Sequence, residues 1–244
     1  MKHAEKGKVY LVGAGPGDPE LLTLRAASLM QTADCIFHDD LVAPEILTLA
    51  GASALVENVG KRCGNKTITQ EQINHLLVEK AKAGNSVVRL KTGDPLLFGR
   101  GGEEIEALHK DSVPFEIVPG ITAGFAAAAA LEASLTDRRL ASKVIFLTAH
   151  RAQSGEEASF GPLPEDATLV IYMPGSDYAR LARQLGDARV APETPCMIVS
   201  GASTPQEQVL HTSVGDLAQT AKLPAPCVVL AGKALSIHRI KKTG

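Results

Sequence analysis

Two charged side chains lie where they could act as an acid and a base. Asp39 ends the apolar segment DCIFHD, and Lys61 follows the apolar segment SALVENV. A carboxylate can accept a proton from a substrate, and a lysine can donate one when its pKa is lowered. We therefore take Asp39 and Lys61 as a candidate acid–base pair. The alternative is that both are ordinary exposed loop charges.

The glycine-rich stretch VGAGPGDP at 12–19 resembles a phosphate-binding loop only in part. Gly13 and Gly15 match the first two glycines of a dinucleotide fingerprint, but the third position is Asp18. Pro16 has no N–H to offer a phosphate, and the Asp18 carboxylate would repel one. A tight turn from a strand into a helix, capped by Asp18, is the simpler interpretation.

A second loop, TGDPLLFGRGG at 92–102, is longer than a strand-to-helix connection requires. Its glycines permit close approach of a ligand, and Asp94 before Pro95 favours a turn. An acid among backbone amides suits a polar or cationic ligand better than a polyanion. The alternative is a plain long connection.

Alternating apolar runs and helical patterns in the first half predict an α/β fold with a mostly parallel sheet. The carboxyl ends of parallel strands meet at one edge, where ligands bind, so the glycine loops, Asp39 and Lys61 should gather there. Strands are expected at 8–13, 34–39, 53–59, 85–93 and 114–120, and helices at 19–33, 44–50, 69–84 and 101–111.

The second half is richer in strand patterns and predicts a separate α/β domain. We expect a boundary near residue 115, giving domains 1–115 and 116–244. Here helices are expected at 121–135 and 176–186, and strands at 142–150, 167–174, 195–203 and 226–234.

Composition narrows the class of protein. With 25 Lys and Arg against 27 Asp and Glu, the net charge of −2 gives no support for general nucleic-acid binding. The four cysteines form no Cys-x-x-Cys motif and the histidines show no metal-ligand spacing, so we expect no metal site. No long apolar run predicts a membrane span and MKHAEKGK is no signal peptide, which favours a cytoplasmic protein.

Several motifs together resemble the uroporphyrinogen-III C-methyltransferase family of the tetrapyrrole methylase superfamily. They are VGAGPGDPELLTLRA, DCIFHDDLV, VVRLKTGDPLLFGRGGEE, VPGITA, VIYMP and APCVVLAGKA, and they extend over essentially the whole chain. The resemblance implies two α/β domains with the active-site cleft between them, and a homodimer. The glycines would then leave room for the ligand.

The resemblance also implies a reaction. Such an enzyme uses S-adenosyl-L-methionine to methylate carbons 2 and 7 of uroporphyrinogen III, giving precorrin-2 for sirohaem and cobalamin biosynthesis and S-adenosyl-L-homocysteine as product. Three alternatives stay open: a C-methyltransferase acting on a later precorrin, a NAD-binding oxidoreductase, which Asp18 disfavours, and a non-catalytic ligand-binding module.

The family's acid–base pair corresponds to Asp39 and Lys61. Two departures from the family pattern stand near the site: Thr92 where a glycine is usual, and His38 where a tyrosine is common. A third is LTDRR at 135–139 in place of Leu-Thr-His-Arg. The cofactor contacts that the resemblance implies are Pro16, Thr92, Gly93, Asp94, Leu97, Thr122, Ala123, Met173 and Ala202.

Overall fold

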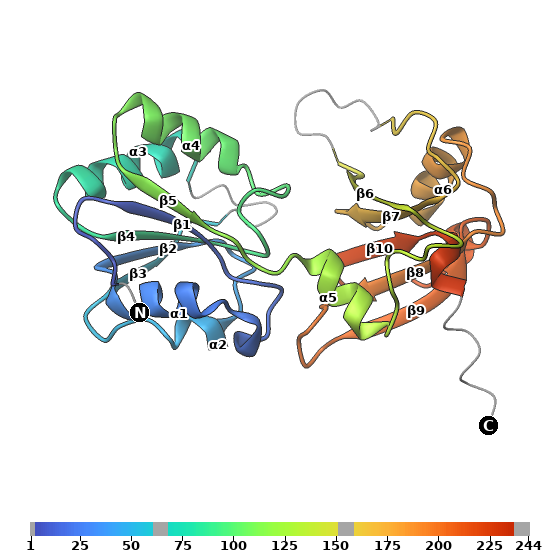
Figure 1. Cartoon of the computed structure of the whole chain (residues 1–244), viewed down its shortest axis with the longest axis horizontal. Helices are drawn as coiled ribbons and strands as arrows, with labels where there is room; N and C mark the ends of the chain where they lie inside the picture. Colours follow the sequence, from blue (N-terminus) through green and yellow to red (C-terminus); the bar gives the residue numbers. More distant parts are fainter. Residues whose placement is uncertain (1–2, 61–67, 151–158, 237–244) are drawn as a thin grey trace. The chain divides into compact units, whose positions relative to one another are not determined.

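The chain folds into two compact α/β units, unit 1 (residues 1–122) and unit 2 (residues 123–244) (Figure 1). The computed structural model describes residues 3–60, 68–150 and 159–236. Each unit contains a five-stranded sheet, so the predicted fold class is confirmed. The division follows Thr122 rather than residue 115, because the strand at 115–118 is hydrogen-bonded into the sheet of unit 1.

Unit 1 is built on a fully parallel sheet with the strand order β3-β2-β4-β1-β5. All carboxyl ends therefore lie at one edge, as expected, and the segments that follow β1, β2, β4 and β5 meet there. The strands are β1 (Val9–Gly13), β2 (Cys35–His38), β3 (Leu55–Asn58), β4 (Val87–Lys91) and β5 (Phe115–Val118).

Helices cover both faces of this sheet (Figure 1). α1 (Leu24–Thr32) and α2 (Pro44–Leu47) pack on one face, and α3 (Gln70–Lys82) and α4 (Gly101–Lys110) pack on the other. Because side chains alternate along a strand, β4 directs Val88 and Leu90 toward α1 and α2. Val87, Arg89 and Lys91 project toward α3 and α4.

The predicted helix over 19–33 is interrupted. Asp18 does cap a turn, accepting a hydrogen bond from the Glu20 amide at 2.8 Å, but this turn is only the 3-10 helix η1 (Pro19–Leu21). Leu22 and Thr23 are extended, and the Thr23 hydroxyl then caps α1. The hydroxyl accepts a hydrogen bond from the Ala26 amide in the first turn of α1, which would otherwise lack a partner. Apolar periodicity does not reveal that a second helix begins here.

α3 begins as the sequence indicates. The Thr69 hydroxyl accepts a hydrogen bond from the Gln72 amide, and the Gln72 side chain accepts one from the Thr69 amide. This reciprocal capping box satisfies two amides that would otherwise lack partners.

Unit 2 contains a mixed sheet of order β6-β7-β10-β8-β9, in which β6 and β7 are parallel and the other pairs antiparallel. The edge strand β9 was not predicted, because QVLHTS lacks a continuous apolar run. The elements are α5 (Ala123–Ala130), β6 (Lys143–Thr148), β7 (Ala167–Tyr172), α6 (Tyr178–Asp187), β8 (Pro195–Ser200), β9 (Gln208–Ser213), η2 (Leu217–Gln219) and β10 (Cys227–Ala231).

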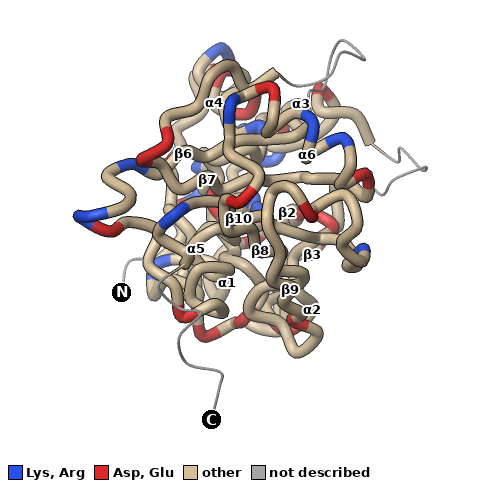
Figure 2. Tube along the Cα trace, turned by 90° about the vertical axis from the view of Figure 1, so that its right-hand side faces the viewer, with Lys and Arg blue, Asp and Glu red and all other residues tan. Residues whose placement is uncertain are grey.

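Charged residues of both signs are interspersed along the traced chain (Figure 2), in keeping with its small net charge. Within the described ranges, no helix has the length and apolarity that a membrane crossing requires.

Three glycines let the loops at the carboxyl edge of unit 1 pack backbone against backbone. A Cβ on Gly13 would lie 2.5 Å from the Cα of Gly120, and a Cβ on Gly120 would lie 2.2 Å from the carbonyl oxygen of Gly93. Gly93 also has a φ of +69°. These positions accommodate close packing of the chain's own backbone, and the expectation that the glycines also leave room for a ligand stays a prediction.

At the opposite edge, Asp34 joins the beginnings of β2 and β4. Its Oδ2 accepts hydrogen bonds from the Ser86 amide at 2.7 Å and the Ser86 hydroxyl at 2.6 Å, and its Oδ1 pairs with Lys6 at 2.6 Å. Lys6 and then the Ser86 groups lower the pKa of this carboxyl to about 2.

Asp34→Asn should lower the free energy of unfolding at neutral pH by about 1–2 kcal/mol, the scale of a hydrogen bond to a charged group. Because the folded-state pKa is depressed, this stability exists above the unfolded value of 3.8 and is lost as the pH falls toward about 2. Denaturant titrations at several pH values should show the difference shrinking in that window. Asp111→Asn, at an exposed pair with Lys82, is the control and should change stability little.

Gly13→Ala should destabilise the chain by about 1–3 kcal/mol, because the new methyl group overlaps backbone that cannot move as a side chain does. Gly102→Ala is the matched control, since a Cβ there meets nothing within 4 Å and alanine favours the helix. Calorimetric melting would check both. A wild-type melting temperature for Gly13→Ala would contradict the close packing of the three loops.

Candidate functional site

Asp39 lies at the carboxyl end of β2, beside the end of β4. Its amide donates a hydrogen bond to the Leu90 carbonyl oxygen at 3.1 Å, which continues the pairing of β2 with β4. Its Oδ1 forms an ion pair with Nη2 of Arg89, and its Oδ2 accepts a hydrogen bond from the Thr92 amide at 3.4 Å. The predicted base is therefore held against the predicted cofactor-binding turn.

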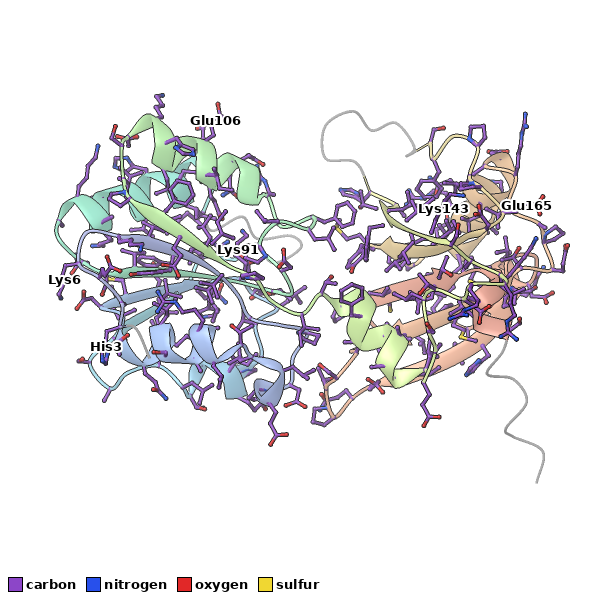
Figure 3. All side chains as sticks on the ribbon, viewed as in Figure 1. His3, Lys6, Lys91, Glu106, Lys143 and Glu165 are labelled. Atoms are coloured by element: carbon purple, nitrogen blue, oxygen red, sulfur yellow. The ribbon has the colours of Figure 1, made fainter. Side chains whose placement is uncertain are left out.

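Behind Asp39 lie three charged side chains that are almost completely buried. Arg89 and Lys91 are each 2% exposed, and Glu104 of α4 is 0% exposed. Arg89 Nε lies 2.9 Å from Glu104 Oε1, and Lys91 Nζ lies 3.0 Å from Glu104 Oε2. Figure 3 labels Lys91 among the strands of unit 1. We call Asp39, Arg89, Lys91 and Glu104 the β4 charge cluster.

Pairing makes this burial tolerable. Desolvation alone would lower the pKa of Arg89, but the charges of Asp39 and Glu104 outweigh it and raise the pKa. Burial and the like charge of Arg89 lower the pKa of Lys91, although Glu104 opposes this. Removing one partner from such a cluster costs about 3–5 kcal/mol, because it leaves a buried charge uncompensated.

The turn after β4 contains three of the predicted cofactor residues. Asp94 Oδ1 accepts a hydrogen bond from the Leu96 amide at 2.8 Å, and Asp94 Oδ2 accepts one from the Gly120 amide at 3.0 Å. This carboxylate therefore joins the loop after β4 to the loop after β5. The hydroxyl oxygen of Thr92 is buried without a hydrogen-bond partner among the described residues. A polar group of a ligand could satisfy it.

The other predicted residues divide between the units. Of those on unit 1, Pro16 follows β1, Leu97 lies in the loop after β4 and Thr122 is the last residue of the unit. On unit 2, Ala123 begins α5, Met173 follows β7 and Ala202 follows β8. Met173 has a φ of +51°, which is uncommon for a residue with a side chain and frequent at ligand sites. The cleft and these cofactor contacts stay predictions.

Lys61, the second member of the acid–base pair, lies outside the described residues, and its role also stays a prediction. His38 is 8% exposed, and its Nδ1 lies 2.9 Å from the Asp39 carbonyl oxygen. The ring therefore contacts the backbone of the candidate base.

Two exposed arginines, Arg100 and Arg139, form ion pairs with carboxylates of the chain itself. Arg100 pairs with Glu103 at 2.6 Å and Arg139 with Asp137 at 3.0 Å. The side chain of Arg139 lowers the pKa of Asp137 to about 2.

The loop after β1 does not present its first amides to a phosphate. The Ala14 amide donates to the Lys91 carbonyl at 2.8 Å, and the Gly15 amide donates to the Gly93 carbonyl at 3.2 Å. The structure thus agrees with the sequence argument against a dinucleotide loop. In the described ranges, no group of three or more His, Cys, Asp or Glu is arranged to hold a metal ion.

Sequence reasoning missed Arg89, Lys91 and Glu104. A signal was present, because VVRLK places two cations within an otherwise apolar strand pattern. Buried cations require a buried anion nearby, but the sequence does not show which of the several acids in GGEEIE faces the strand.

A protein-family model, Tetrapyrrole (Corrin/Porphyrin) Methylases, matches residues 8–218. Siroheme synthase 1 of Halorhodospira halophila is 44% identical over 239 residues, covering 96% of this chain and 49% of that protein. The chain spans about half the length of the first curated relatives that it matches. Uroporphyrinogen-III C-methyltransferase of Paracoccus denitrificans is 45% identical over 234 residues, covering 94% of this chain and 82% of that protein.

A solved structure gives the same result. The uroporphyrin-III C-methyl transferase of Thermus thermophilus, complexed with S-adenyl homocysteine, aligns with a TM-score of 0.83 and 36% identity, covering 94% of this chain and 99% of that one. The family expected from the motifs is confirmed. With a family model matched across both units and relatives of this similarity, the chain belongs to the tetrapyrrole methylases.

Proposed function

We propose that the chain is an S-adenosyl-L-methionine-dependent C-methyltransferase that converts uroporphyrinogen III to precorrin-2 by methylating carbons 2 and 7. The observation that carries this proposal is the similarity to the Paracoccus denitrificans enzyme, which extends over most of both chains. The product would supply sirohaem or cobalamin biosynthesis.

The predicted cofactor residues are chemically suited to S-adenosyl-L-methionine. Apart from Asp94, they carry no charged side chain, which fits a sulfonium ligand better than a polyphosphate. The buried Thr92 hydroxyl, which has no hydrogen-bond partner among the described residues, could bond to the cofactor beside the positive-φ turn at Gly93. When bound, the cofactor supplies an activated methyl group to the electron-rich pyrrole carbon.

The chain's own residues then have two tasks, alignment and removal of a proton. The loops at the carboxyl edge align the reactants, and alignment lowers the barrier of a transfer between preactivated groups. Methylation leaves the macrocycle with a proton to lose, and Asp39 accepts it on a carboxylate oxygen. Lys61 holds or donates a proton, or pairs with a carboxylate of the substrate.

We also propose that the protein is a cytoplasmic homodimer. Leu24, on α1, is 78% exposed, and Leu41 is 58% exposed. A second copy would remove such apolar surface from water. Light scattering on the purified full chain should give twice the mass of the chain, and a mass equal to one chain would contradict the dimer.

The full chain, incubated anaerobically with uroporphyrinogen III and cofactor labelled in its methyl group, should transfer label to the tetrapyrrole. Mass spectrometry would then detect two added methyl groups in the product. Absence of labelled tetrapyrrole would overturn the proposal, and NAD binding without S-adenosyl-L-homocysteine binding in calorimetry would favour an oxidoreductase.

Asp39→Asn should lower kcat by about 10²–10⁴-fold, the usual contribution of a general base, and Lys61→Met should also lower kcat. Affinity for S-adenosyl-L-homocysteine should change little in either variant. Asp40→Asn is the matched control and should change kcat little. It removes a carboxylate next to Asp39 in the sequence, whose Oδ1 accepts a hydrogen bond from the Asn58 side chain at 3.2 Å. Wild-type rates for Asp39→Asn would remove Asp39 from the mechanism.

A further inference from the structure

We propose that Arg89 is a positioning residue: held by the buried Glu104, it fixes the direction in which Asp39 presents its carboxylate. This inference rests on the proposed function, in which Asp39 accepts the proton. It extends the site inward, from the loops of the carboxyl edge to Arg89, Lys91 and Glu104, whose side chains are almost completely buried.

The Arg89 guanidinium is held by partners at all three nitrogens. Nε donates to Glu104 at 2.9 Å, and Nη1 lies 3.3 Å from the carbonyl oxygens of both Phe37 and Leu90. Nη2 contacts Asp39. Because the guanidinium is a planar fork, fixing two nitrogens determines where the third points, which a lysine ammonium would not do.

Asp39 is in turn held at both carboxylate oxygens. Arg89 takes Oδ1, and the Thr92 amide reaches Oδ2 at 3.4 Å. The base and the turn expected to bind the cofactor are therefore oriented by one connected set of contacts. Small errors in the placement of reacting groups are costly in rate.

Exposure changes sharply along the cluster. The side chains of Arg89, Lys91 and Glu104 are at most 3% exposed, whereas that of Asp39 is 28% exposed. A buried ion cluster is a weak source of stability, because well-packed apolar side chains of similar volume often serve as well. Because these buried charges end at the accessible carboxylate of Asp39, we infer that their role is to hold that carboxylate in place.

Lys91 completes the charge balance. Without it, the buried Glu104 and the partly exposed Asp39 would share the single positive charge of Arg89. The Lys91 ammonium lies within 3.1 Å of both Glu104 oxygens, leaving Arg89 free to engage Asp39 with its remaining nitrogen. Glu104 thus acts on Asp39 through Arg89, and Lys91 supports that pairing by balancing the charge of Glu104.

A double-mutant cycle on methyl transfer tests this inference. We expect Arg89→Lys to lower kcat by about 30-fold in the unsubstituted chain and by less than about 3-fold in the Asp39→Asn variant, because residues that act as a unit are non-additive. Calorimetric affinity for S-adenosyl-L-homocysteine should stay within about 2-fold, since Arg89 is 2% exposed and is not among the predicted cofactor contacts.

Arg25→Lys is the matched control. Arg25 pairs with Glu116 at 3.0 Å in the same unit, away from Asp39, and its substitution should leave kcat unchanged in both backgrounds. If Arg89→Lys fails to melt cooperatively, Glu104→Gln replaces it in the cycle, since it removes the negative charge that holds Arg89 while keeping the volume of the side chain. The non-additivity is then expected with that variant.

Equal losses of kcat in both backgrounds would overturn the inference, because Arg89 would then act independently of Asp39. No loss of kcat in either background would also overturn it, because Arg89 would then not be needed to position Asp39. Failure of the proposed function is recognised separately, since the unsubstituted chain would then transfer no methyl group to uroporphyrinogen III.

Discussion

The buried carboxylate of Glu104 is the constraint on which the arrangement of unit 1 depends. A charge without exposure to water must be paired, and the two cations that pair with it, Arg89 and Lys91, come from the central strand β4. Since side chains at i and i+2 of a strand share a face, both cations reach α4 together. The pairing fixes α4 on the sheet and at the same time directs Arg89 toward Asp39.

A second constraint acts at the carboxyl edge, where three loops approach more closely than side chains allow. The backbones of Gly13, Gly93 and Gly120 are in contact, and the Asp94 carboxylate accepts a hydrogen bond from the Gly120 amide. These contacts join the segments after β1, β4 and β5 into one surface. The glycine-rich character that resembles a phosphate loop is thus explained by packing, while the amides of Ala14 and Gly15 are occupied by carbonyl groups.

Much of the fold was predictable because its signals are local. The capping box of Thr69 and Gln72, the apolar strands of unit 1 and the placement of Asp39 after β2 all follow from neighbouring residues. The exceptions have local causes of another kind. Thr23 restarts a helix that periodicity predicts as continuous, and β9 is an edge strand without the apolar run of a buried one.

By itself, the sequence determined the α/β class, the family and the loop ends at which chemistry belongs, because apolar periodicity and long motifs are contained in consecutive residues. Only the tertiary structure decided that Arg89, Lys91 and Glu104 form one buried cluster behind Asp39. The reason is that an ion pair depends on distance in space. Asp39 follows β2, Arg89 lies in β4 and Glu104 lies in α4, so their partnership exists only once these three elements have packed together.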